Sequence, residues 1–96
     1  MAIAGSRPEG GIRIEIERAG DAAAPWTYQG QAVTPGAQFP LRVVLSDRGD
    51  VHVELPSGAP PMLRTRVRLL VRSLWRRARD EGVAPARRLM RWRADD

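Results

Sequence analysis

Five arginines that recur on one side of a predicted helix are the residues of this sequence best placed to do chemistry. They are Arg64, Arg68, Arg72, Arg76 and Arg79. At helical spacing these side chains share one arc of the surface. Guanidinium groups bind phosphates and carboxylates through paired hydrogen bonds, so this arc is the candidate site for a nucleic acid or another anion.

The row of arginines holds no interspersed acid that would moderate its own repulsion. From Arg64 to Arg76 every fourth residue is arginine, and the first acid in the row is Asp80. Like charges at this spacing destabilise a helix modestly, so a bound anion that neutralises the row favours the folded chain. We therefore expect the phosphate backbone of DNA or RNA as the partner. A second interpretation is that arginine merely fills polar positions, in a chain that is also rich in alanine, glycine and proline.

Two apolar residues on the polar side of the same helix support a different hypothesis. Met62 and Leu69 fall outside the apolar stripe, as residues in a protein contact do. The helix face would then contact an acidic protein surface or a second copy of the chain. The sequence thus predicts a small binding module associated with nucleic acid through its arginines or, alternatively, a protein-interaction or homodimeric adaptor domain.

Residues suited to catalysis are sparse. The single histidine, His52, lies on the outer side of a predicted strand, with Glu54 two residues away and Ser46 at the end of the preceding strand. A general base needs a partner acid or nucleophile, and an open sheet face offers no pocket in which the two could work. The chain has no cysteine, no recognisable metal-ligand spacing and no glycine-rich phosphate loop. We expect no enzymatic activity, no metal and no cofactor.

The positive charge of the chain is concentrated in its last third. Residues 61–96 hold eleven arginines and four acids, a net charge of +7, whereas residues 1–60 hold five arginines and seven acids, a net charge of −2. Such asymmetry indicates an anionic partner for the C-terminal part.

Nothing in the sequence is typical of a membrane or secretory segment. No apolar run approaches the roughly 18 residues that a membrane span requires. The first eleven residues also lack the apolar stretch of a signal peptide. We expect a cytoplasmic chain without membrane insertion.

Four segments alternate between apolar and polar residues, as half-buried strands do. They are IRIEIER (12–18), WTYQGQAV (26–33), FPLRVVL (39–45) and VHVEL (51–55). The alternation directs Trp26, Tyr28 and Phe39 inward, so the outer face is not predicted to stack on bases. Gly30 interrupts the inner row, which predicts a bulge or a close backbone approach.

The loop between the last two segments predicts their register. Asp47-Arg48-Gly49 ends in glycine, as three-residue hairpin loops with a positive φ at their last residue do. Leu45 then faces Val51 on the inner side. Arg42 faces Glu54 on the outer side, where the two form a cross-strand ion pair.

A long helix is predicted from Pro61 to Gly82, because proline suits the first turn and glycine suits the left-handed end. Its apolar side chains cover an arc of about 140° on a helical wheel. They are Leu63, Val67, Leu70, Val71, Leu74, Trp75 and Ala78. The following segment APARRLMRWR can form a short second helix from Pro85. Within it we expect Trp92 to dock on the body of the domain, since large aromatic side chains are usually mostly buried.

Together these elements predict an α+β fold. A four-stranded antiparallel meander has its apolar face covered by one long C-terminal amphipathic helix, and a short second helix can follow. At 96 residues the chain is one domain. We divide it into a flexible lead-in at 1–11, a β-β-β-β-α domain at 12–82, and a short helix with a tail at 83–96.

Overall fold

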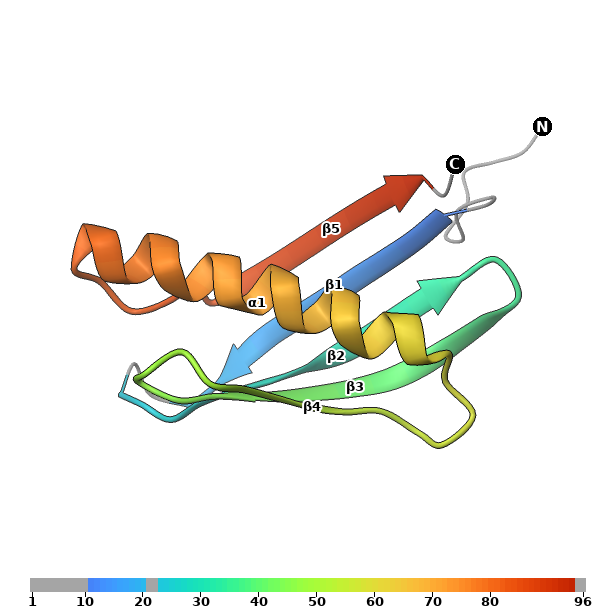
Figure 1. The fold of residues 1–96 in the computed structure, drawn as a ribbon, viewed down its shortest axis with the longest axis horizontal. Coiled ribbons are helices and arrows are strands. Elements are labelled where there is room, and N and C mark those ends of the chain that lie inside the picture. Colours follow the sequence, from blue (N-terminus) through green and yellow to red (C-terminus); the bar gives the residue numbers. More distant parts are fainter. Residues whose placement is uncertain (1–10, 21–22, 95–96) are drawn as a thin grey trace.

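The structure, a computed structural model, describes residues 11–20 and 23–94 of the chain. Its elements are β1 (Gly11–Ala19), β2 (Trp26–Thr34), β3 (Ala37–Leu45), β4 (Val51–Glu54), α1 (Pro61–Glu81) and β5 (Arg88–Ala94). The strands form one antiparallel sheet in the order β4-β3-β2-β1-β5, with α1 across one face (Figure 1). The α+β class and the long helix are confirmed, whereas the sheet has five strands instead of the predicted four. The predicted lead-in, apart from Gly11, and residues 95–96 of the predicted tail lie outside the described residues.

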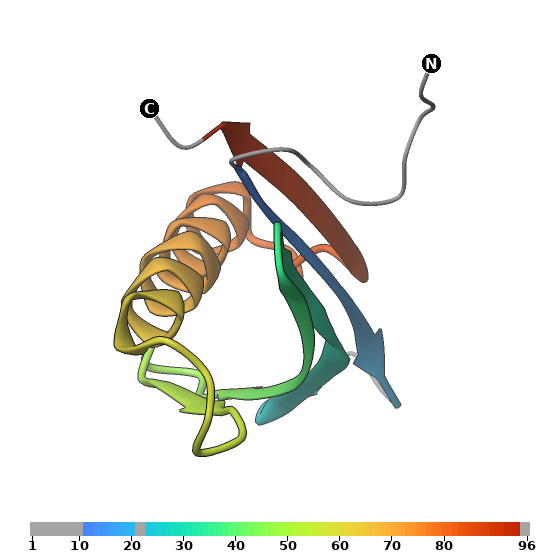
Figure 2. The ribbon, with the colours of Figure 1, turned by 90° about the vertical axis from the view of Figure 1, so that its right-hand side faces the viewer.

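The sheet curls around α1, which closes its open side (Figure 2). Gly30 in β2 pairs with Ile16 of β1. A Cβ atom at this position would lie only 1.8 Å from the backbone oxygen of Glu15 in β1. The close backbone approach predicted from the sequence is therefore confirmed, and only glycine fits there without a shift of β1.

The core lies between the concave face of the sheet and α1. Alternate residues of each strand point into it, as the period of two predicts. Its buried members are Ile12, Ile14, Ile16, Tyr28, Ala32, Leu41, Val43, Leu45, Val53, Leu63, Val67, Val71 and Leu89. Trp26, Phe39, Leu70, Leu74 and Trp75 pack against this cluster from its margins and are partly buried.

The hairpin between β3 and β4 has the predicted register. Leu45 pairs with Val51 and Arg42 with Glu54. The Ser46 amide donates to the Asp50 carbonyl at 2.9 Å, which closes the three-residue loop. Gly49 has φ +90°, and a Cβ atom at this position would lie only 2.7 Å from the ring of Trp75. Glycine therefore also leaves room for this side chain of α1.

The helix also begins and ends as predicted. Pro61 is its first residue, and Gly82 ends it with φ +69°, while the Gly82 and Val83 amides donate to the last-turn carbonyls of Arg79 and Ala78. Mean hydropathy along α1 is low because arginines alternate with the apolar stripe. Within the described residues, no helix is both long and apolar enough to cross a membrane.

The predicted second helix is wrong: residues 88–94 form β5, an edge strand beside β1. Leu89 pairs with Ile16 on the concave side and is buried, whereas Met90 and Trp92 lie on the convex side. Pairing with β1 supplies a full ladder of backbone hydrogen bonds, which a helix this short cannot match without packing. The docking expected for Trp92 is wrong as well, since its side chain remains 56% exposed.

Three hydrogen bonds hold the connection from α1 to β5 against the sheet. The Tyr28 hydroxyl donates to the Ala86 carbonyl at 2.7 Å, and Arg18 Nη1 donates to the Pro85 carbonyl at 2.5 Å. The Arg18 amide donates to the Arg87 carbonyl at 2.6 Å. Burial raises the pKa of the Tyr28 phenol above its ordinary value, an effect that the nearby Arg18 charge partly opposes.

Candidate nucleic-acid interface

Two side chains at the margin of α1 fix the rotation of the helix about its axis. Trp75 Nε1 donates to the Asp47 carbonyl at 3.3 Å, in the loop of the β3–β4 hairpin. Arg64 Nη1 donates to the Val53 carbonyl of β4 at 2.5 Å. With this flank against β4 and the apolar stripe in the core, the remaining arc of arginines faces away from the sheet.

Three of the five predicted site residues form an exposed row on that outward face. Arg68, Arg72 and Arg76 are all exposed, and none of their side chains forms a hydrogen bond or ion pair within residues 11–20 and 23–94. Successive members lie about 6 Å apart along the helix axis, four residues at 1.5 Å each.

The other two predicted site residues lie at the border of the row and have partners inside the molecule. Arg64 is held by the Val53 carbonyl. The guanidinium of Arg79 stacks over the Trp75 ring with 5.0 Å between its Cζ and the ring centroid. Both residues remain exposed. Their positions are therefore more fixed than those of Arg68, Arg72 and Arg76, and fewer of their donors are free for a ligand.

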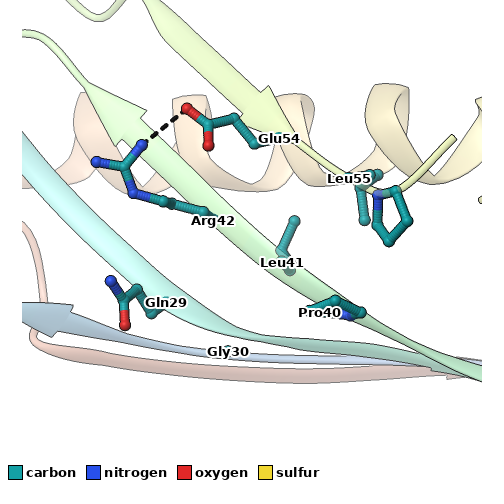
Figure 3. A pocket seen from close by; sticks show the side chains of 8 residues that line it. Gln29, Gly30, Pro40, Leu41, Arg42, Glu54 and Leu55 are labelled. Carbon is teal, nitrogen blue, oxygen red and sulfur yellow. Dashed lines mark hydrogen bonds and ion pairs between the residues drawn. The ribbon is translucent and has the colours of Figure 1, made fainter.

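Glutamates on the convex face of the sheet are neutralised by neighbouring arginines. Distances between guanidinium nitrogen and carboxylate oxygen are 2.8 Å for Arg13–Glu15, 2.7 Å for Arg42–Glu54 and 3.6 Å for Arg88–Glu17. Figure 3 shows the Arg42–Glu54 pair beside an open hollow that Gly30, Leu41 and Leu55 also line. The charged side chains of this hollow thus already compensate each other. The row of arginines on α1, in contrast, keeps its positive charge.

The two candidate residues for a protein contact are accessible. Leu69 is 65% exposed and Met62 is 44% exposed. On the helical wheel both lie on the flank of α1 opposite to Arg64 and Trp75, which border β4. A partner that covered this flank would therefore also reach the row of arginines.

His52 and its neighbours form an open surface cluster. His52 Nε2 lies 3.5 Å from Glu54, which already pairs with Arg42, and the histidine side chain is 69% exposed. Ser46 Oγ accepts hydrogen bonds from the amides of Arg48 and Asp50, so it caps the hairpin turn. Among the described residues no group of three or more His, Cys, Asp or Glu could hold a metal ion.

Some features of other charged residues on α1 were not predicted from the sequence. Arg77 pairs with Glu81 at 3.6 Å, and the i,i+4 spacing of the two was a signal that could have found this pair. Arg66 lies partly buried beside the stripe, and its Nη1 is buried without a hydrogen-bond partner. No sequence signal separates Arg66 from the exposed arginines except its place on the wheel.

Comparisons with known proteins do not indicate a function for this chain. No protein-family model, no curated protein and no solved structure matches the chain. The function has to be inferred from the site itself.

Proposed function

We propose that the chain is a small binding module, without enzymatic activity, that binds the phosphate backbone of DNA or RNA through the outward face of α1. The observation that carries this proposal is the exposed row Arg68, Arg72 and Arg76, none of which pairs with a carboxylate within the described residues. The cytoplasmic location expected from the sequence is compatible with such a ligand.

The row favours phosphate because of its charge and its donors. Each guanidinium carries a positive charge and presents a planar set of N–H donors that fits phosphate oxygens. Repulsion along the row destabilises the free helix modestly, and a bound polyanion removes that repulsion. Contacts of this type position a protein on a nucleic acid and carry no base information. We therefore expect binding without sequence preference.

The salt dependence of binding tests this function. With about three phosphate contacts, the affinity for mixed-sequence duplex DNA should fall with a log–log slope near −3 against salt concentration. Duplexes of different sequence should bind alike. A dissociation constant weaker than roughly 100 μM for both DNA and RNA at about 50 mM salt would overturn the nucleic-acid proposal.

A second candidate function is protein contact through the same helix, favoured by the exposure of Leu69 and Met62. The partner would be an acidic protein surface or a second copy of the chain. This function would be favoured over the first if the chain associated in a concentration-dependent way and Leu69→Glu abolished that association. Its affinity for DNA would then be weak and would not depend on salt concentration.

A further inference from the structure

The two edges of the sheet are protected to different degrees. β4 is four residues long, and the Val53 carbonyl on its outer side accepts a hydrogen bond from Arg64 of α1. β5 is seven residues long and ends the sheet on the other side, where no described strand pairs with it. Figure 2 shows β5 at the border of the curled sheet. An unpaired edge of this length is a template for another strand.

The register identifies the backbone groups that this edge presents. The Arg18 amide donates to the Arg87 carbonyl, so this opposed pair is hydrogen bonded. Hydrogen-bonded and non-hydrogen-bonded pairs alternate along an antiparallel ladder. Leu89 and Arg91 therefore direct their peptide groups to β1. Arg88, Met90 and Trp92 direct theirs to the open edge.

The side chains along this edge combine two chemical characters. Met90 and Trp92 lie on the convex side with 61% and 56% of their surfaces exposed. Arg91, on the concave side, and Arg87, just before the strand, are both exposed and form no ion pair with any described residue. A strand laid beside β5 would thus meet an apolar row on one face and positive charge on the other.

We propose that β5 binds an extended acidic segment of a partner protein by strand addition. Backbone groups of Arg88, Met90 and Trp92 pair with the segment. Its apolar residues lie beside Met90 and Trp92, and its alternating acidic residues face Arg91. A second copy of β5 fits less well, because it would bring arginines and no acid beside the arginines of this edge.

The test uses synthetic peptides and the full chain. A fluorescent peptide of alternating glutamate and valine should bind, whereas an alternating lysine and valine peptide should bind at least about tenfold more weakly. A peptide of alternating glutamate and proline carries the same charge but cannot form a strand, and it should also bind at least about tenfold more weakly. Equal binding of the two glutamate peptides would overturn the proposal, since charge alone would then explain it.

Amide hydrogen exchange locates the bound strand. The amides of Arg88, Met90 and Trp92 should exchange quickly in the free chain and become protected in the complex with the glutamate–valine peptide. Those of Leu89 and Arg91 should be protected in both states, because they face β1. Protection of Arg88, Met90 and Trp92 that rises with protein concentration alone would show that a second copy occupies the edge, and it too would overturn the proposal.

One substitution removes a hydrogen-bond donor from the open edge of β5 and keeps the hydrogen bonds between β5 and β1. Met90→Pro deletes an N–H that points outward, and proline is tolerated on the open side of an edge strand. The variant should therefore fold like the parent but no longer bind the glutamate–valine peptide. Arg91→Glu, which leaves the backbone unchanged, should instead reverse the preference toward the lysine–valine peptide. Arg68→Gln/Arg72→Gln on α1 should bind the glutamate–valine peptide like the parent, which separates this site from the nucleic-acid interface. Unchanged peptide binding by both β5 variants would contradict the proposed site.

Discussion

On the convex face of the sheet, arginines lie next to glutamates; on the outward face of α1, they lie next to one another. Arg42 contacts Glu54 and Arg13 contacts Glu15, each within 3 Å, across or along strands. Arg68, Arg72 and Arg76 have no such partners among the described residues. Because the residue type is the same on both faces, the difference lies in what surrounds each charge. Of these two faces, only the outward face of α1 retains positive charge for a ligand.

The largest effect we expect concerns the orientation of α1, on which the comparison depends. Leu63 is fully buried, whereas Leu69 is 65% exposed on the same helix. Leu63→Ala should lower the free energy of unfolding by about 2–5 kcal/mol, the range for truncating a buried leucine. Leu69→Ala is the matched control and should stay within roughly 0.5 kcal/mol. Chemical denaturation measures both, and equal losses would contradict the orientation of the helix.

A smaller effect is expected where the sheet curls. Gly30→Ala forces a Cβ into the backbone of β1 and should cost about 1–3 kcal/mol, the usual range for overpacking. Gly36→Ala is the control, because nothing lies within 4 Å of a Cβ there. Thermal melting of the two variants compares them. An unchanged melting temperature for Gly30→Ala would show that the fold does not require the close approach of β2 to the backbone of β1.

Tyr28→Phe tests the hydrogen bond between β2 and the segment that connects α1 to β5. Loss of the hydrogen bond to the Ala86 carbonyl should cost about 1 kcal/mol near neutral pH. Since burial raises the pKa of Tyr28 in the folded state, its contribution is present below about pH 10 and is lost as the pH rises through the folded pKa. The parent should therefore lose more stability than Tyr28→Phe as the pH rises above about 10, the ordinary phenol value, and through the higher pKa of the folded state. Parallel losses in that range would contradict the role of the phenol.

The smallest stability effects contrast paired and unpaired arginines. Arg42→Gln removes an exposed ion pair and should cost about 0.2–1 kcal/mol. Arg72→Gln should be neutral or slightly stabilising, within roughly 0.5 kcal/mol, because it relieves repulsion from Arg68 and Arg76. Added salt should reduce both differences. A larger loss for Arg72→Gln than for Arg42→Gln would mean that the helix row has structural partners.

Local patterns predicted the first four strands, the β3–β4 hairpin and α1. The glycine of the Asp47-Arg48-Gly49 loop determines the register of the β3–β4 hairpin. The periodicity of 3.6 residues identifies the apolar side chains of α1 that face the core. β5 was missed because arginines occupy both of its faces and, among residues 88–92, Leu89 alone is buried, so no alternation is visible. Its strand conformation depends on pairing with β1, some 70 residues away in the sequence.

The candidate site was predictable in outline but not in its internal contacts. Helical spacing alone brings the arginines to one face. That Arg64 reaches the Val53 carbonyl and Arg79 stacks on Trp75 depends on how α1 lies against the hairpin. Neither contact has a signature in the sequence, because each joins side chains to groups whose positions the tertiary fold sets.

The most direct test compares two double variants that remove the same charge from the two faces. Arg68→Gln/Arg72→Gln takes two arginines from α1, and Arg42→Gln/Arg88→Gln takes two from the convex face of the sheet. The measurement is the salt dependence of affinity for one mixed-sequence DNA duplex. We expect the helix variant to lose roughly 2 units of log–log slope and the sheet variant to keep the parent slope. Equal losses in the two variants would show that net charge, rather than the row on α1, determines binding, and would contradict the proposed interface.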